Sequence, residues 1–328
     1  MKQIYSNFKN SDSINNLLLH SSPSLLNKLK KIKDILYQPY LFKSLPLYTK
    51  IYKIILKKQS QPLLLAFTGK NNLEEYFCNT GQLNYLGSIL ARDIEKYRLP
   101  DIWFNTSSTL CFPAENYEIF SSYTWVRQVL DIQHLVNGLP AQLSNGLVKR
   151  DLKRLDKSDY HVKRAQNLFF LKSFYYKIYK PHIQKRFHTL AHISSIQEMA
   201  INTAFGEVLL CFKNNKLWSG GIICYSGDTL SVPWLGVVDG SPDIVKEGGL
   251  KAVYYEALKL AINRDFNKMD FSNSRPFLNN GVYRHKKRWG CITKKPIKGS
   301  TPLKVGVLCS NKDVYNFFQE YPIICFTL

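Results

Sequence analysis

The stretch MDFSNSRPFLNNGVYRHKKRWG, residues 269–290, combines one carboxylate with a cluster of cations. Asp270 ends the apolar stretch NKMDF, and a carboxylate held at a strand end can orient an amine or take its proton. Four cations follow within five positions, directly before Trp289: Arg284, Lys286, Lys287 and Arg288. Ammonium and guanidinium groups bind phosphate and stabilise oxyanion charge. The segment therefore predicts a site in which Asp270 and Lys286 act on bound reactants.

Each of these residues also has a structural alternative. An aspartate at a strand end can accept hydrogen bonds from loop N–H groups. Lys286 can be one more surface cation while its neighbours Arg284, Lys287 and Arg288 hold the phosphate. The indole of Trp289 packs a loop onto a core more often than it stacks on a base.

A second candidate region lies at Gly248 and Gly249, before the helical pattern LKAVYYEALKLAIN. A glycine-flanked helix start offers unpaired N–H groups and the positive end of the helix dipole to a phosphate. We expect both glycines, together with Lys251, to contribute to donor binding. The alternative is that the glycines only punctuate a loop.

The elements around these residues follow an α/β pattern. The stretches EVLLCFK, LWSGGIICY and LSVPWLGVV predict a meander of three strands joined by NNK and SGD turns. Upstream, PLLLAFTG and YTWVRQVLDI predict strands, whereas LNYLGSILARDIEKY has helical spacing. The stretch LFFLKSFYYKIYKPHIQKRF predicts a helix that Pro181 stops or kinks.

Two basic segments accompany this pattern. Between Lys28 and Lys58 lie nine lysines and one acid, and we expect two short basic helices flanking Pro39 and Pro46. They either contact an anionic membrane or polyanion or pack on the body as an amphipathic layer. The second segment, LVKRDLKRLDKSDY, predicts a cationic helix with Leu147, Leu152 and Leu155 inward.

Composition limits the partners. The 328-residue chain carries a formal net charge of +21, which predicts a nucleic acid, an anionic membrane or a phosphorylated ligand as partner. Its seven scattered cysteines are typical of buried, reduced thiols in a cytosolic protein. No secretory signal, spanning segment or metal-ligand spacing is evident, and HTLAH at residues 188–192 lacks the glutamate of a zinc motif. We expect a cytoplasmic protein, peripheral at most at the inner face of the membrane, without a metal.

The meander, the glycine-marked helix and the following strand resemble the central layout of the GNAT acyltransferase fold. The segment after Lys268 resembles the FemAB-like branch, in which DFG-x-S is followed by a glycine and FK-x-x-WG. The matching residues are Asp270, Phe271, Ser274, Gly281, Lys286, Trp289 and Gly290. The chain departs from this pattern at Ser272 and Asn273, which replace Gly and Arg, and at His285, which replaces the aromatic residue.

The resemblance implies tandem GNAT-like halves with mixed, mainly antiparallel sheets, behind a basic helical extension. The expected segments are 1–60 for the extension, 61–146 for the first half and 147–328 for the acyltransferase half. The resemblance implies direct acyl transfer to an amine from acyl-CoA, with aminoacyl-tRNA as the alternative donor and a cell-wall or peptide amine as acceptor. A catalytically silent polyanion-binding module is the further alternative. The residues expected to line the substrate cleft are Ser274, Arg275, Tyr283 and Trp234.

Overall fold

The computed structural model describes residues 48–54, 62–69, 73–78, 83–90, 100–107, 116–133, 146–188, 191, 193–296, 300–308 and 313–326. The chain forms two compact units, and each unit is built from more than one segment of the chain. The first unit contains Val129–Ser272 and Arg288–Ile292, and the second contains Leu41–Gln128, Asn273–Lys287 and Thr293–Leu328. The two units are described separately below. The division at residues 60 and 146 expected from the sequence stays a prediction.

The first unit is built on most of a seven-stranded mixed sheet of order β12-β6-β11-β10-β9-β8-β7. Its strands are β6 (Val126–Asp131), β7 (Tyr160–Ala165), β8 (Gly206–Lys213), β9 (Lys216–Ser226), β10 (Thr229–Val237), β11 (Lys268–Ser274) and β12 (Ile292–Lys294). The predicted meander is β8, β9 and β10, which pair antiparallel in sequence. Asn214 and Asn215, at φ 51° and 59°, make the turn between β8 and β9 in the left-handed conformation that asparagine tolerates.

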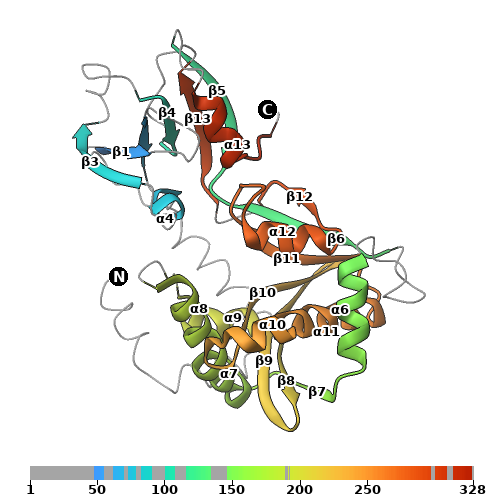
Figure 1. The fold of residues 1–328 in the computed structure, drawn as a ribbon. Coiled ribbons are helices and arrows are strands. Elements are labelled where there is room, and N and C mark those ends of the chain that lie inside the picture. Colours follow the sequence, from blue (N-terminus) through green and yellow to red (C-terminus); the bar gives the residue numbers. More distant parts are fainter. Residues whose placement is uncertain are drawn as a thin grey trace. The chain divides into compact units, whose positions relative to one another are not determined.

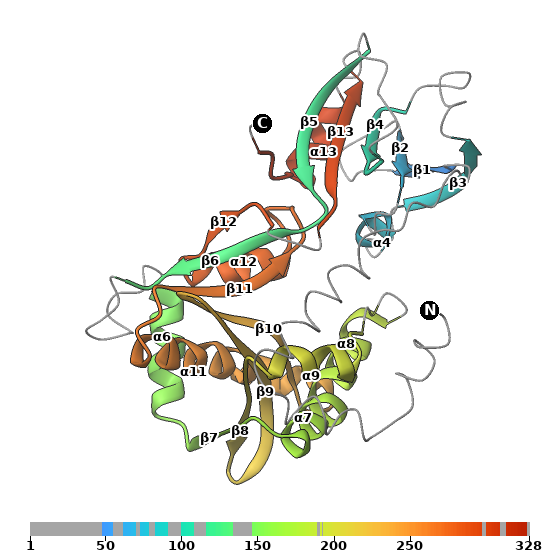
Figure 2. The ribbon, with the colours of Figure 1, turned by 180° about the vertical axis from the view of Figure 1, so that it is seen from behind.

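Helices cover both faces of this sheet (Figures 1 and 2). They are α6 (Gly146–Asp156), α7 (Leu168–Phe174), the π-helix η2 (Tyr175–Tyr179), α8 (Lys180–Phe187), α9 (Ile196–Thr203), the 3-10 turn η4 (Val238–Gly240), α10 (Pro242–Glu247) and α11 (Gly249–Asn263). Side chains alternate along β8: Leu209 and Cys211 join the core under α6 and α11. Val208 and Leu210 join a second core under α7, η2 and α9. The unit therefore has three layers, with the sheet in the middle.

Helix α6 and the helical run α7–η2–α8 refine two predictions. In α6, Leu152 and Leu155 are buried as predicted, Val148 is buried as well, and the helix ends at Asp156. The side chain of Leu147, the other residue of the predicted inward stripe, lies outside the described part of the structure. The rest of the predicted basic helix forms strand β7 instead, at the edge of the sheet. The run α7–η2–α8 continues through Pro181, which lies in the first turn of α8, where its missing N–H is tolerated.

The second unit has a six-stranded mixed sheet of order β3-β1-β2-β4-β13-β5. Its elements are β1 (Tyr48–Ile54), β2 (Leu63–Thr68), α4 (Leu73–Cys78), β3 (Leu83–Leu90), β4 (Ile102–Asn105), β5 (Tyr117–Tyr123), α12 (Gly281–Arg288), β13 (Pro302–Leu308) and α13 (Val314–Glu320). Its core joins β1, β2 and β4 to the C-terminal elements through an aromatic cluster in which Phe77 touches Phe104, Phe277 and Phe317.

Two sequence predictions in this unit are wrong. The helical spacing at Leu83–Leu90 belongs to strand β3, because short apolar runs fit either period and pairing with β1 decides the outcome. Tyr48–Ile54, placed in a basic helical extension, is strand β1 between β2 and β3. Its Tyr, Thr and Ile residues favour strands. The remainder of the predicted extension, residues 1–47 and 55–60, lies outside the described residues.

The predicted α/β class with mixed sheets is confirmed. Among the cysteines whose side chains the structure describes, Cys211, Cys224, Cys291 and Cys325 have free thiols. Cys211 and Cys291 are buried, as predicted, and burial raises the pKa of the Cys211 thiol to about 12. Cys325 is exposed, contrary to the prediction of buried thiols.

Candidate functional site

Strands β10 and β11 pair only at their beginnings. They run parallel, and the paired residues end at Ser231 opposite Asp270. Beyond this point, β10 shifts register with β9 between Ser231 and Trp234, a stretch containing Pro233, which has no N–H to donate. In β11, Ser272 takes the left-handed conformation at φ 65°. Both strands therefore leave regular geometry directly after the last pair. We call β10 after Ser231 and β11 after Asp270 the strand fork.

Asp270 lies at the point where the fork begins. Its side chain is buried at 9% exposure, and its Oδ1 accepts a hydrogen bond of 2.8 Å from the backbone N–H of Ser272. This hydrogen bond stabilises the left-handed turn at Ser272. It agrees with the structural alternative in which Asp270 accepts a hydrogen bond from a backbone N–H. Ser272 occupies the position at which the resembling branch has glycine, and its positive φ gives the physical reason for a glycine there.

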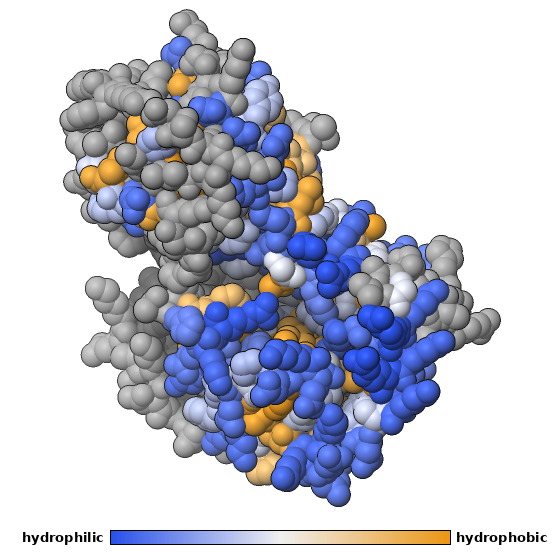
Figure 3. Space-filling model, viewed as in Figure 1, coloured by the Kyte–Doolittle hydropathy of each residue, from blue (hydrophilic) through white to orange (hydrophobic). Residues whose placement is uncertain are grey.

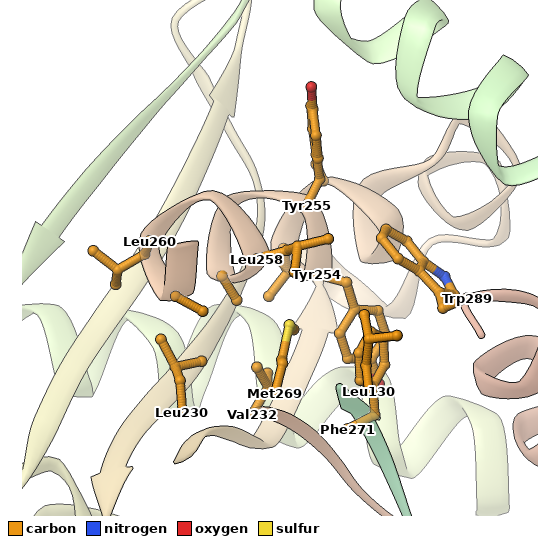
Figure 4. Close-up of a cluster of buried hydrophobic side chains, with 14 of the residues drawn as sticks. Leu130, Leu230, Val232, Tyr254, Tyr255, Leu258, Leu260, Met269, Phe271 and Trp289 are labelled. Atoms are coloured by element: carbon orange, nitrogen blue, oxygen red, sulfur yellow. The ribbon is translucent and has the colours of Figure 1, made fainter. Parts of the chain in front are cut away.

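Aromatic side chains pack around the base of the fork. Tyr254 from α11 stacks on Phe271 at 4.5 Å between ring centroids, and Trp289 lies 5.6 Å from Phe271. Figure 4 shows these three rings together, with Tyr255 pointing away from them. Trp289 is 1% exposed, so its role in the core is the packing role that the sequence favoured. Burial raises the pKa of Tyr254. The nearby Cys291 and Asp270 also raise it, whereas Arg186 lowers it.

Sequence reasoning missed a buried histidine on the other face of the sheet. His182 in α8 is 5% exposed, and its Nδ1 has no hydrogen-bond partner. Burial, and secondarily the charge of Arg186, lowers the pKa of His182 to about 4. A Cβ on Gly236 of β10 would lie 3.1 Å from the Cβ of His182, so this glycine admits α8 close to the strand. The available signal was the spacing of His182 and Arg186, four residues apart on one helix.

The two glycines before α11 are required by the geometry of the turn between α10 and α11. Gly248 adopts φ 107°, which side chains rarely take, and it ends α10. A Cβ on Gly249 would lie 2.6 Å from Cγ2 of Ile244. Lys251 forms an ion pair of 2.5 Å with Asp151 of α6. These contacts explain the residues without a ligand, and their role in donor binding stays a prediction.

Trp234 lies in β10 beyond the register shift. Its Nε1 donates a hydrogen bond of 3.1 Å to Oγ of Ser194, and its half-buried ring packs against the core under α7 and η2. This placement gives Trp234 a packing role, and its predicted place in a substrate cleft stays a prediction.

In the second unit, α12 separates its cations by face. Lys286 is 3% exposed, and its Nζ donates a hydrogen bond of 2.7 Å to the backbone oxygen of Asn273. The side chains of Arg284, Lys287 and Arg288 are exposed. The helix begins after Asn280, whose Oδ1 accepts from the N–H groups of Val282 and Tyr283. Burial contradicts the alternative that Lys286 is one more surface cation, and the binding of phosphate by its exposed neighbours stays a prediction.

Two predicted cleft residues of this unit, Ser274 and Tyr283, form hydrogen bonds with a buried glutamine that sequence reasoning missed. The Oε1 of Gln128 accepts from Oγ of Ser274 at 2.5 Å, and its Nε2 donates to the backbone oxygen of Tyr283 at 3.1 Å. The hydroxyl of Tyr283 bonds Oγ1 of Thr293 at 2.8 Å. The available signal was the alternation in VRQVLD, which places Gln128 on the same side of the strand as Val126 and Leu130.

Arg275 is held by an aromatic face. Its guanidinium lies 4.0 Å from the ring centroid of Trp125, a distance typical of a cation–π contact. Trp125 was not among the predicted residues.

The predicted site residues are divided between the units. Gly248, Gly249, Lys251, Trp234, Asp270 and Arg288 belong to the first unit, and Ser274, Arg275, Tyr283, Arg284, Lys286 and Lys287 belong to the second. Within the described residues, no cluster of three or more His, Cys, Asp or Glu side chains could hold a metal. His188 lies just past the end of α8, and His192 lies outside the described part of the chain.

Comparisons with known structures give matches at low identity. FemX matches with 11% identity and a TM-score of 0.43, covering 82% of this chain and 85% of FemX. L-PGS from Bacillus licheniformis matches with 9% identity and a TM-score of 0.39, covering 83% and 84%. A GCN5-related N-acetyltransferase from Sphaerobacter thermophilus matches with 10% identity and a TM-score of 0.34, covering 80% and 76%.

No protein-family profile matches the chain, and no curated protein matches it. Among the helices that the structure describes, none combines the length and the apolar character needed to cross a membrane.

Proposed function

We propose that the protein is an N-acyltransferase that moves an acyl group from an acyl-CoA-type donor directly to an amine. The observation that carries this proposal is the strand fork, where β10 and β11 stop pairing after Ser231 and Asp270. Strands that separate within a sheet leave backbone N–H and C=O groups that a ligand with amide groups can pair with. The pantetheine arm of coenzyme A is such a ligand.

Asp270 is the proposed acid–base residue. The amine nitrogen attacks the thioester carbonyl carbon, a C–N bond forms, the C–S bond breaks and the thiolate leaves. The amine loses one proton and the thiolate gains one. Asp270, at the last pair before the fork, accepts the amine proton or orients the amine, and water or the acceptor returns a proton to sulfur. General-base assistance contributes about 10² to 10⁴ in rate.

Lys286 has a positioning role in this proposal. Its buried Nζ donates a hydrogen bond to the backbone oxygen of Asn273, which lies in β11 three residues after Asp270. The exposed cations Arg284, Lys287 and Arg288 then supply the charge that holds donor phosphates, as does the first turn of α11 after Gly248 and Gly249. In this proposal Ser274, Arg275 and Tyr283 line the substrate cleft.

The test is a paired measurement on wild type and Asp270→Asn. Calorimetry with acetyl-CoA should give the same affinity for both proteins, while single-turnover transfer to an amine falls about 10² to 10⁴ fold in the variant. Asp228→Asn is the matched control, because Asp228 is exposed and pairs with Lys268 at the opposite end of β11. Unchanged transfer in Asp270→Asn would remove this residue from the site.

Aminoacyl-tRNA is the second candidate donor, and helix α6 favours it. Arg150, Lys153, Arg154 and Lys157 are exposed on and just after this helix, which forms a strongly hydrophilic patch in Figure 3. A row of cations on one helix can follow a phosphate backbone. With this donor, Lys153→Gln combined with Arg154→Gln should weaken tRNA binding and flatten its salt dependence. Retained acetyl-CoA transfer without tRNA binding would exclude it.

A further inference from the structure

The run α7–η2–α8 has an inner face and an outer face of different character. Leu171, Phe174, Ile178 and Tyr179 are buried in the core against β8 and β9. Opposite them lie large aromatic side chains that the fold leaves in water. Phe169 is 75% exposed and Tyr176 is 56% exposed. The inner face explains how the helix is anchored, whereas the exposure of the outer aromatic rings is not explained by packing among the residues that the structure describes.

The outer aromatics alternate with lysines. Phe169, Lys172 and Tyr176 follow the spacing i, i+3, i+7, which places them on one side of a helix, and Lys177 adjoins them. We call these four residues the aromatic–lysine face. Residues 168–187 contain five cations and no Asp or Glu. Within the described part of the chain, neither Lys172 nor Lys177 forms an ion pair.

This face has the chemistry of a surface that meets anionic lipid. Aromatic rings enter the boundary between headgroups and acyl chains, while the long lysine side chains reach back to lipid phosphates. Each lysine near an anionic surface contributes about 1 kcal/mol, or about five-fold in affinity. A three-quarters exposed phenylalanine on the outer side of a helix suits a flat apolar boundary, whereas bases stack on rings that line a groove.

We propose that the aromatic–lysine face docks the first unit onto a membrane surface of anionic phospholipids. This is a contact separate from the strand fork and from the basic residues 1–47. It would hold the protein at the surface by a helical segment lying in the interface plane, in the layer that α7, α8 and α9 form on one side of the sheet (Figures 1 and 2). The proposal stands whether or not the fork transfers acyl groups.

The experiment measures binding of the full chain to phosphatidylcholine vesicles with and without phosphatidylglycerol. Wild type should bind only the vesicles that contain phosphatidylglycerol. The double variant Lys172→Gln with Lys177→Gln should bind about 25-fold more weakly, from two five-fold losses. Phe169→Ser with Tyr176→Ser should lose about ten-fold or more. These positions are exposed, and a melting curve for each variant checks that it folds.

Two control variants match these changes elsewhere. Tyr315→Ser removes a 74% exposed ring on α13, and Lys153→Gln with Arg154→Gln removes two exposed cations on α6. Both should bind vesicles as wild type does. Equal losses in controls and test variants would overturn the proposal, as would wild-type binding by the test variants. Loss of RNA binding with unchanged vesicle binding in the test variants would assign the face to RNA instead and also overturn it.

Discussion

In the strand fork, two strands stop pairing although both continue, and Pro233 and Ser272 each break the regular backbone. In the segment from the end of β11 into α12, by contrast, two buried polar side chains, those of Ser274 and Lys286, form hydrogen bonds with neighbours. Lys286 holds a backbone oxygen, and Ser274 bonds Gln128. A region in which buried polar groups are satisfied is stabilised by those bonds. Where two strands of a sheet separate, a ligand with amide groups can pair with their backbone, and in our proposal that difference separates support from binding surface.

The comparison also changes how the motif is understood. Its conspicuous cation, Lys286, is inside the protein, and its less conspicuous neighbours are outside. The run of cations from Arg284 to Arg288 therefore belongs to a helix that buries Lys286 on one face and exposes the other cations. Its functional part, in the proposal above, is Asp270 together with the exposed cations.

The largest expected effect on stability concerns His182, the buried group behind β10. Its pKa in the folded protein, about 4, lies below its ordinary value of 6.5, so folding favours the neutral imidazole. The contribution of the neutral His182 imidazole to stability is fully present above pH 6.5 and is lost as the pH drops from 6.5 toward 4. The lowered pKa of His182 corresponds to about 3 kcal/mol of unfolding free energy, at 1.36 kcal/mol for each pKa unit.

Denaturant unfolding between pH 7 and pH 4 checks this expectation. Wild type should lose that stability, and His182→Gln should show a shallower loss over the same interval. His161→Gln, at an exposed histidine on β7, should keep the wild-type pH dependence. Parallel curves for wild type and His182→Gln would show that the imidazole is not held neutral by burial.

The next effect separates the two faces of α12. Lys286→Ala removes a charged hydrogen bond to the backbone oxygen of Asn273 and should cost about 2 to 3 kcal/mol of stability. Lys287→Ala changes an exposed side chain and should stay within about 0.5 kcal/mol. Thermal unfolding of both variants gives the comparison. If Lys287→Ala were the more destabilising change, the assignment of buried and exposed faces would be reversed.

The smallest effect concerns the strained turn next to Asp270. Ser272→Gly should stabilise the protein by about 0.5 to 1 kcal/mol, because relief of the left-handed conformation exceeds the added chain entropy of glycine. Urea titration measures the change. Ser231→Gly, on the opposing strand without positive φ, should be destabilising. A loss of stability in Ser272→Gly would mean that the serine side chain contributes more than the strain costs.

The sequence was informative where local chemistry decides structure. The meander, its asparagine turn and the glycine turn at Gly248 follow from strand patterns and from backbone conformations that few residues adopt. The strands at Tyr48–Ile54 and Leu83–Leu90 could not be derived, since pairing between distant segments decides them. Gln128 and His182 were missed for a related reason: the sequence around a polar residue does not show which groups that residue contacts in the fold.

The same limit applies to the candidate site. The prediction that Asp270 ends its strand is wrong, because β11 continues from Lys268 to Ser274 and only its pairing with β10 ends at Asp270. That loss of pairing coincides with a register shift around Pro233 in another strand, which the sequence near Asp270 does not show. Burial of Lys286 depends on the backbone of Asn273 and could not be read from a run of cations.

The central claim is that the donor pairs with the backbone of the strand fork. Hydrogen–deuterium exchange of the full chain with and without acetyl-CoA tests it most directly. Amides of β10 after Ser231 and of β11 after Asp270 should gain protection when the donor binds, whereas the paired residues Thr229–Ser231 and the amides of β8 should not change. Donor binding with no protection at the fork, or with protection confined to other elements, would contradict the account.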